Sequence, residues 1–179
     1  MLKRLKRISG RLRSENPYWR YNIDEYELPG GSIGEYHWVE TPGSVFVIPV
    51  TDDGRFVMTR QFRYLNQRES LEFPGGGVDP SLGYEKSAIR ELRQESGFDC
   101  DSLEIIGEFN PFNGVTSEIC RVYLASGLTG VEVTADESEE FEIMELSNQE
   151  IFDKINKGEL WDGMTLAAWA LYTAKLPQD

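Results

Sequence analysis

The chain has 179 residues, of which 40% are hydrophobic and 27% are charged, and its formal net charge is −13 at pH 7. This length suits one domain with a substantial core, and no apolar run approaches the ~20 residues that a membrane-spanning helix needs. The negative net charge disfavours binding to nucleic-acid phosphates. The N-terminus lacks the apolar stretch of a signal peptide and the cysteines are few, Cys100 and Cys120, so we expect reduced thiols in a cytoplasmic protein.

The N-terminal region is predicted to hold a basic arm followed by two strands. Residues 1–16 form the arm, since no acid precedes Glu15 and six basic residues do: Lys3, Arg4, Lys6, Arg7, Arg11 and Arg13. A solvated arm, or one that packs on an acidic partner subunit, is favoured over a membrane or nucleic-acid patch. Within residues 17–42, segments 19–28 and 35–40 alternate in polarity and predict an antiparallel hairpin.

Residues 43–179 are predicted to form the main domain. Strands are expected at 45–50 and 56–62, paired as a hairpin through a turn at 51–54, and then at 71–73, 103–109, 120–125 and 141–146. Helices are expected at 84–96, ending at Gly97, at 147–156 with Ser147 or Asn148 as the cap, and at 164–175 with an apolar face of Leu166, Ala170 and Leu171. This order of strands and helices predicts an α+β sandwich with a mixed sheet.

Two acidic residues on the first of these helices predict a metal site. Glu91 and Glu95 are four residues apart, so they lie one above the other beside the apolar residues Ala88 and Leu92. Like charges at this spacing repel, and near a core they need a positive partner. A divalent cation such as Mg²⁺ or Mn²⁺ suits their oxygen ligands, and the alternative is an ordinary solvated helix face.

The preceding segment supports a joint site for an ion and a phosphate. A short strand at 71–73 leads into the glycine-rich turn at 74–80, which allows the backbone to approach a ligand closely. Turn and helix together resemble the signature of the Nudix family, G-x5-E-x7-R-E-U-x-E-E-x-G-U, in which U is a large apolar residue. The matching positions are Gly76, Arg90, Glu91, Leu92, Glu95, Gly97 and Phe98, whereas Leu82 and Gln94 stand where the signature has Glu.

The resemblance extends to the branch that cleaves ADP-ribose and nucleotide sugars, through segments 43–64 and 158–168. It implies an α/β/α sandwich with a mixed sheet and an N-terminal hairpin region. It also implies hydrolysis of a nucleoside diphosphate-sugar to a nucleoside monophosphate and a sugar phosphate, with Mg²⁺ or Mn²⁺ as cofactor. The stretch Asn110-Pro111-Phe112-Asn113-Gly114 keeps only one proline of the branch's motif, which weakens ADP-ribose as the specific substrate.

Roles for individual residues follow from the same resemblance. The metal ligands are Glu91, Glu95 and the carbonyl of Gly75, while Arg63, with Arg60 as a second candidate, binds the substrate. Arg90 is expected to lie away from the acid pair and to orient the loop. Glu139 is the favoured general base, with Glu140 and Glu137 as alternatives, and a surface acidic cluster is the other interpretation of this segment.

The N-terminal strands are implied to help form a homodimer and the substrate pocket. Trp19 and Tyr36 are candidates to stack on a nucleobase, although such aromatics can also simply cover the sheet or fill the dimer interface. The rival function is a Nudix-fold nucleotide-binding module with weakened catalysis, for which Leu82 and Gln94 are the reasons. Because His37 is the single histidine and is expected in a strand, a catalytic triad is disfavoured.

Overall fold

The chain folds into two units in this computed structural model, which describes residues 4–132 and 140–176. The first unit comprises Met1–Gly43 and Asn110–Ile119, and the second comprises Ser44–Phe109 and Cys120–Asp179. The second unit carries the turn and helix of the signature. No helix of the described residues is long and apolar enough to cross a membrane.

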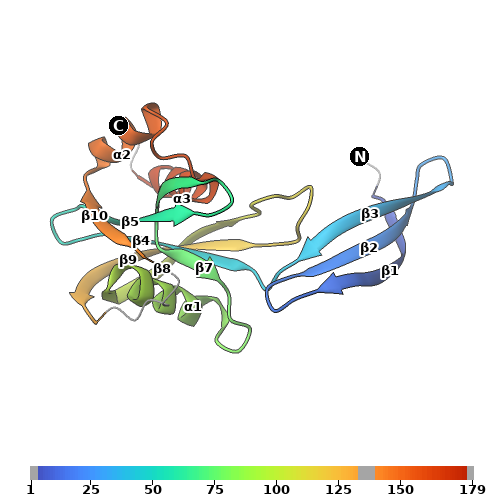
Figure 1. Ribbon diagram of the computed structural model, residues 1–179, viewed down its shortest axis with the longest axis horizontal. Coiled ribbons are helices and arrows are strands. Elements are labelled where there is room, and N and C mark those ends of the chain that lie inside the picture. Colours follow the sequence, from blue (N-terminus) through green and yellow to red (C-terminus); the bar gives the residue numbers. More distant parts are fainter. Residues whose placement is uncertain (1–3, 133–139, 177–179) are drawn as a thin grey trace. The chain divides into compact units, whose positions relative to one another are not determined.

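The first unit is an antiparallel sheet of three strands in the order β1-β2-β3, drawn in blue in Figure 1. Its strands are β1 (Lys6–Glu15), β2 (Arg20–Glu27) and β3 (Ile33–Glu40). The predicted hairpin is therefore present, and the predicted basic arm is mostly a third strand. Cross-strand ion pairs explain why this charged segment joins the sheet, since Arg7 binds Asp24 and Arg11 binds Glu35, each at 2.9 Å.

The second unit contains two small sheets. One has the order β7-β4-β9-β8 and the other the order β10-β5-β6. The strands are β4 (Ser44–Pro49), β5 (Phe56–Arg63), β6 (Arg68–Glu72), β7 (Gly75–Gly77), β8 (Phe98–Phe109), β9 (Cys120–Gly130) and β10 (Glu142–Leu146). Because β4 pairs parallel with β9 and antiparallel with β7, the four-stranded sheet is mixed, as predicted.

The predicted hairpin between residues 45–50 and 56–62 is wrong. The turn exists, with Gly54 at φ 80° and its N–H donating to the carbonyl of Thr51. However, β4 and β5 belong to different sheets and share only one isolated bridge, between Val50 and Phe56. The chain passes from one sheet to the other at this turn, because β4 pairs with β7 and β9 whereas β5 pairs with β6 and β10.

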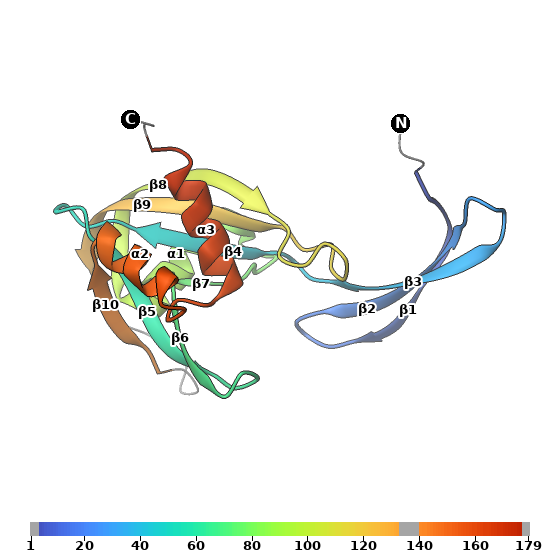
Figure 2. The ribbon, with the colours of Figure 1, turned by 90° about the horizontal axis from the view of Figure 1, so that it is seen from above.

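Helices cover both faces of the strands in this unit, which gives an α/β/α arrangement (Figures 1 and 2). They are α1 (Gly83–Glu91), continued by the π-helical turn η1 (Leu92–Ser96), then α2 (Asn148–Asn156) and α3 (Gly163–Thr173). Alternation along β4 creates the two cores. Val45 and Val47 pack with Ala88 and Leu92 of the first helix, whereas the intervening residues Phe46 and Ile48 pack in the cluster that includes Trp169 of α3.

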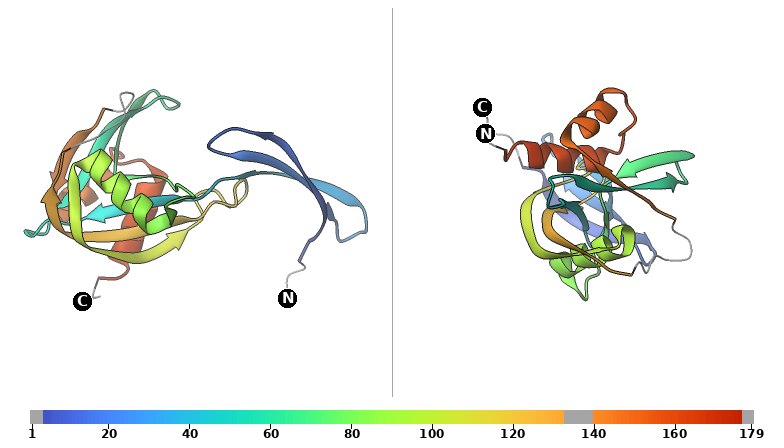
Figure 3. Two further views of the ribbon diagram at one scale, coloured as in Figure 1. Left: turned by 90° about the horizontal axis from the view of Figure 1, so that it is seen from below. Right: turned by 90° about the vertical axis from the view of Figure 1, so that its left-hand side faces the viewer.

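The C-terminal helices confirm the predicted cap and correct the predicted face at one residue. Ser147 and Glu150 form a reciprocal capping box at the start of α2. In α3, Leu166 and Leu171 pack against the core as predicted, whereas Ala170 is exposed and the fully buried residues are Thr165, Ala168 and Trp169. Nearly every residue of this helix is apolar, so periodicity alone did not distinguish its faces. The two views of Figure 3 show α1 and α3 on opposite sides of the strands. Cys100 and Cys120 do not form a disulfide with each other, as predicted.

Candidate metal and diphosphate site

The segment from the end of β6 through β7 is the centre of the site. It begins with Glu72, continues through Phe73 and Pro74, and enters the glycine strand β7. The strand is anchored on one side by β4, where Phe46 pairs with Gly75, and the carbonyl of Pro74 accepts a hydrogen bond from the N–H of Val47 at 2.8 Å. The backbone that faces the helical acids is therefore held in place by the four-stranded sheet.

Both predicted acidic ligands converge on this glycine strand. The backbone N–H of Gly75 donates to Oε2 of Glu95 at 3.0 Å, and the Glu95 residue is 6% exposed. Next to it, a Cβ placed on Gly76 would lie 2.8 Å from the carboxylate of Glu91. Glycine at this position allows the carboxylate and the strand to come this close. The structure thus brings Gly75, Glu91 and Glu95 together, as the sequence predicts.

A change of helix type lies between the two acids. Glu91 ends α1, and Glu95 belongs to the π-helical turn η1, which ends at Gly97 with a left-handed φ of 70°. The wider π turn bonds residue i to residue i+5, so residues four apart come close to vertical alignment, and such turns are frequent at functional sites. Buried Leu92 and Ser96 fix the turn from the core side, where Ser96 Oγ donates to the Leu92 carbonyl at 2.5 Å.

Arg90 does not lie away from the acid pair, and this expectation is wrong. Its Nη2 donates to Oε1 of Glu91 at 2.7 Å and to the carbonyl of Gly77 at 3.2 Å. Its Nη1 lies 3.5 Å from the carboxylate of Asp79, in the turn that precedes the helix. The predicted contact with the loop is therefore present. In addition, the guanidinium fixes the position of the Glu91 side chain, because it donates a hydrogen bond to the carboxylate.

Arg63 is held by a carboxylate that sequence reasoning missed. Its Nε donates to Oε1 of Glu72 at 2.8 Å, and its Nη2 bonds to the other oxygen, so the pair is bidentate. Glu72 is 2% exposed, whereas the Arg63 side chain is 43% exposed. The hydrogen bonds that Arg63 donates to Glu72 raise the pKa of Arg63, and the carboxylates of Asp162 and Glu95 add to this effect through space. Arg63 is therefore close enough to Glu95 to be affected by its charge.

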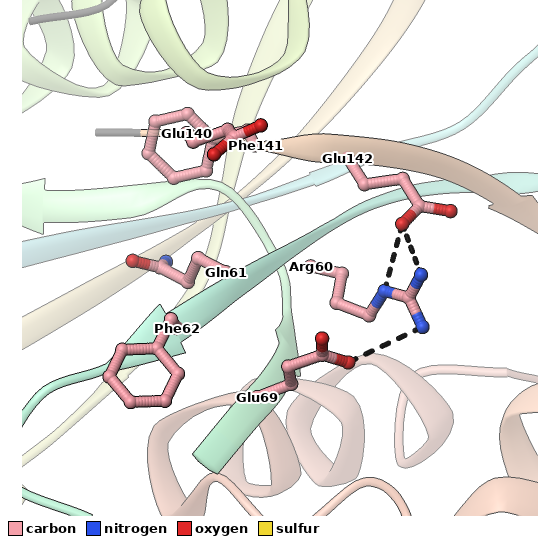
Figure 4. A pocket seen from close by; sticks show the side chains of 7 residues that line it. All are labelled: Arg60, Gln61, Phe62, Glu69, Glu140, Phe141 and Glu142. Atoms are coloured by element: carbon pink, nitrogen blue, oxygen red, sulfur yellow. Dashed lines mark hydrogen bonds and ion pairs between the residues drawn. The ribbon is translucent and has the colours of Figure 1, made fainter. Parts of the chain in front are cut away.

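Arg60 lies on the opposite face of β5. Residues three apart on a strand point to opposite sides, so Arg60 and Arg63 cannot face the same ligand through this sheet. The guanidinium of Arg60 is bound by Glu142 and lies 3.4 Å from the carboxylate of Glu69, as Figure 4 shows. These contacts raise the pKa of Arg60, above all the hydrogen bond to Glu142. Its predicted role in substrate binding remains a prediction.

The remaining predicted residues belong to the segment before β10 and to the first unit. Glu140 is exposed beside β10, whereas Glu137 and Glu139 are outside the described residues. Trp19 and Tyr36 belong to the three-stranded unit. Trp19 closes the turn between β1 and β2, where its N–H donates to Asn16 Oδ1 at 2.9 Å. The Tyr36 hydroxyl donates to the carbonyl of Gly114 at 3.0 Å, at a cavity of about 300 Å³ that Trp38 also lines.

The donor set at the glycine strand fits a hard divalent cation. Mg²⁺ is usually held by one or two carboxylates and keeps several waters, with substrate phosphates completing its shell. Glu91 and Glu95 supply the two carboxylates, and they lie beside the glycine strand β7. Within residues 4–132 and 140–176, no group of three His, Cys, Asp or Glu side chains is arranged to hold a metal. The remaining ligands would therefore be waters, substrate oxygens and a carbonyl such as that of Gly75.

Known proteins identify this arrangement. The family model of the NUDIX domain matches residues 40–166. The chain belongs to the Nudix family. Over 148 residues it is 33% identical to the ADP-ribose pyrophosphatase of Bacillus subtilis (strain 168), covering 82% of this chain and 80% of that protein. It is also 31% identical to the methanol dehydrogenase activator of Bacillus methanolicus over 151 residues, or 83% of this chain and 82% of that one.

The fold comparison agrees with the family. A crystal structure of an ADP compounds hydrolase superposes with a TM-score of 0.83 over 97% of this chain and 95% of that chain, at 18% sequence identity. At this identity the likeness shows the fold. The predicted Nudix fold, with its mixed sheet, flanking helices and antiparallel N-terminal strands, is confirmed.

The two departures from the Nudix signature lie together. Leu82 precedes α1 and Gln94 lies in η1, and both line a cavity along this helix with Lys86, Ile89, Arg90 and Arg93. Arg90 of this lining also binds Glu91, whereas the Glu95 carboxylate accepts from the N–H of Gly75. The two substitutions leave the pair Glu91 and Glu95 in place.

Proposed function

We propose that the chain is a divalent-metal-dependent hydrolase that cleaves the diphosphate of an ADP-ribose-like nucleoside diphosphate-sugar. The products would be a nucleoside monophosphate and a sugar phosphate. The observation that carries this proposal is the convergence of Glu91, Glu95 and the Arg63–Glu72 pair on one short backbone segment, residues 72–76. The name of the Bacillus subtilis relative, an ADP-ribose pyrophosphatase, supports the choice of substrate class.

The acidic residues would hold the cofactor at the diphosphate. Glu91 and Glu95 would bind Mg²⁺ or Mn²⁺, together with the carbonyl of Gly75. When bound, such an ion neutralises non-bridging phosphate oxygens and positions a water for attack. Arg90 keeps Glu91 in place through its 2.7 Å hydrogen bond and links it to the carbonyl of Gly77.

Arg63 would bind the substrate phosphates. Glu72 engages its Nε and one hydrogen of Nη2, which leaves both Nη1 hydrogens and the second Nη2 hydrogen for another acceptor. Two N–H groups on one edge of the guanidinium match two phosphate oxygens. Since Glu72 is buried and fixed in β6, it limits the rotation of Arg63, and less conformational entropy is lost when the phosphate binds.

The general base would come from the acidic segment before β10. Glu139 is the favoured candidate, with Glu140 and Glu137 as alternatives. Glu140 is exposed and lines a cavity with Phe141 and Glu142, at the start of β10. As general base, such a carboxylate would accept the proton of the attacking water. Comparison of Glu139→Gln with Glu140→Gln would assign the role to the variant with the larger loss of turnover.

A homodimer in the cytoplasm is the proposed working form. The first unit exposes large apolar side chains along its strands, among them Ile8 at 49%, Leu12 at 42% and Ile33 at 63%. A sheet of three strands with such residues gains stability when a second copy covers it. Light scattering of the purified protein would show a mass of two chains if this proposal is correct and of one chain if it is not.

The rival function is a nucleotide-binding module with weakened catalysis. Leu82 and Gln94 favour it, because two signature acids are missing and fewer ions can be held. The preserved contacts of Glu91, Glu95 and Arg63 favour hydrolysis. Both hypotheses predict nucleotide binding, so only turnover separates them.

The proposal is tested by release of nucleoside monophosphate from a panel of nucleotide sugars and dinucleoside polyphosphates in the presence of Mg²⁺. We expect ADP-ribose to be hydrolysed, and Glu95→Gln to lower the rate by at least ~100-fold, the scale for removing a key electrostatic group. Gln94→Glu is the matched control at the adjacent position and should keep activity. Full activity of Glu95→Gln would refute the ligand assignment, and binding without turnover across the panel would favour the rival.

A further inference from the structure

One arginine of the second unit differs from the others in its surroundings. The unit contains seven arginines. Six of them pair with a carboxylate: Arg55, Arg60, Arg63, Arg90, Arg93 and Arg121. Arg68, which is exposed and begins β6, pairs with no carboxylate of residues 4–132 and 140–176. Acidic side chains outnumber basic ones by 31 to 18 in this chain, so a shortage of carboxylates does not explain the difference.

An aromatic ring holds the Arg68 guanidinium in place of a carboxylate. The Cζ atom of Arg68 lies 3.7 Å from the centroid of the Trp161 ring. Trp161 is itself fixed, because its Nε1 donates to the carbonyl of Glu69 at 3.0 Å. Stacking of this kind leaves the N–H groups at the rim of a guanidinium available to acceptors. Arg68 is therefore oriented before a ligand arrives, and less conformational entropy is lost when an anion binds.

Arg68 lies directly opposite Arg63. Strands β5 and β6 form an antiparallel hairpin, labelled in Figure 2, in which Arg63 and Arg68 are register partners. Both side chains therefore leave the sheet on the same face, from Cα atoms that are ~5 Å apart. Like charges directly opposite each other destabilise a sheet. An anion that binds both guanidinium groups would remove this repulsion.

The charge balance at Arg63 shows what a second cation would add. Both carboxylate oxygens of Glu72 bind the Arg63 guanidinium, and the carboxylates of Asp162 and Glu95 act on it through space. Arg63 and Glu72 together are neutral, so this pair offers a phosphate directed hydrogen bonds but little net positive charge. The charge of Arg68 is not cancelled by a carboxylate of the described residues, and it therefore attracts an anion to this face.

We propose that Arg68 is a second phosphate ligand, and that Arg63 and Arg68 hold neighbouring phosphates of the substrate diphosphate. This inference rests on the proposed function, because it takes the ligand of Arg63 to be a diphosphate. A ligand with a single phosphate engages one of the two arginines at a time. The pair therefore favours the diphosphate substrate over the nucleoside monophosphate product, which helps the product to leave.

Calorimetry of the full-length protein with Mg²⁺ tests the pair, using α,β-methylene ADP, a diphosphate that resists hydrolysis at its bridge, and AMP. The parent should bind the diphosphate more tightly than AMP. Arg68→Gln should weaken binding of the diphosphate about tenfold, the scale of one lost hydrogen bond between charged groups, and binding of AMP by no more than about twofold.

Arg121→Gln is the matched control. Arg121 also stacks on an aromatic ring, with its Cζ 4.2 Å from the centroid of Tyr84, but it pairs with Glu108. This variant should bind both nucleotides as the parent does. Three results would overturn the inference: a parent without preference for the diphosphate, an Arg68→Gln variant that keeps the full preference, or an equal loss for both nucleotides. The same loss of preference in Arg121→Gln would also overturn it.

Turnover of ADP-ribose, measured separately, distinguishes this inference from the proposed function. If the parent hydrolyses nothing and Arg68→Gln still loses the preference for the diphosphate, the hydrolase activity fails and the two-arginine site stands. If the parent hydrolyses ADP-ribose and Arg68→Gln keeps both the kcat/KM and the binding preference of the parent, the assignment of Arg68 fails and the activity stands.

Discussion

The pair of Arg63 and Glu72 makes an asymmetric prediction for stability. The two residues share a bidentate ion pair, but Glu72 is 2% exposed and the Arg63 side chain is 43% exposed. Removing either partner breaks the same hydrogen bonds, yet the group left behind differs. Arg63→Ala leaves a carboxylate in the core without its cation, whereas Glu72→Gln leaves a guanidinium that water already reaches.

The expected magnitudes follow from that difference in exposure. A buried charge that loses its partner costs about 3–5 kcal/mol of unfolding free energy, and the lower end applies here because water can enter the space vacated by the arginine. For Glu72→Gln, the amide oxygen keeps one hydrogen bond and the guanidinium stays hydrated, so the loss is about 1–2 kcal/mol. The double variant removes both charges and should be more stable than Arg63→Ala alone.

Urea denaturation of the parent, both single variants and the double variant at pH 7 measures these differences in unfolding free energy. Equal losses in the two single variants, or a double variant that is no more stable than Arg63→Ala, would refute the reasoning.

Three further predictions concern the glycine strand, a helix cap and the turn before α1. Gly76→Ala should lower turnover by about 100-fold, because the new Cβ would lie 2.8 Å from the Glu91 carboxylate and displace it by about 1 Å. Gly77→Ala is the control, since a Cβ at Gly77 would have no atom within 4 Å, and its turnover should be near that of the parent. Ser147→Ala removes the capping box of α2 and should cost about 1 kcal/mol in urea denaturation; no loss would mean that the cap is dispensable. Hydrogen bonds from Ser81, with Arg90 nearby, lower the pKa of Asp79 below its usual 3.8. The gain in unfolding free energy of the parent over Asp79→Asn should therefore be fully present at pH 7 and should decline below ~pH 4 in urea denaturation. A gain that increases on acidification would contradict this.

The local features of the site could be predicted from the sequence. Glu91 and Glu95 come together because their spacing along one helix decides which side they share, and Gly97 ends that helix as expected. The capping box at Ser147 is likewise a relation between neighbours. Arg63 could be predicted from the family motif. Its pairing with Glu72 could also have been suspected, because Glu72 ends a strand just before the glycine turn, and a carboxylate that is buried there needs a cation.

The features that the sequence did not predict depend on partners far along the chain. The β4 strand pairs with β9 instead of β5, since strands with similar apolar patterns compete for the same edges. The buried face of α3 includes Trp169 and excludes Ala170, because a helix that is apolar on all sides takes its orientation from what it packs against. Only the pairing of β5 with β6, in which Thr59 lies opposite Glu72, brings the Glu72 carboxylate to Arg63.

The sequence by itself determined the acids, the glycines and the helix that joins them, because residues within one or two turns constrain each other through backbone geometry. Only the tertiary structure decided that β7 delivers the N–H of Gly75 to Glu95, that Glu72 holds Arg63, and that Arg60 faces away from Arg63. Each of these depends on which strands pair and in which register. Many pairings are compatible with the local pattern, and the packing of the whole core selects among them.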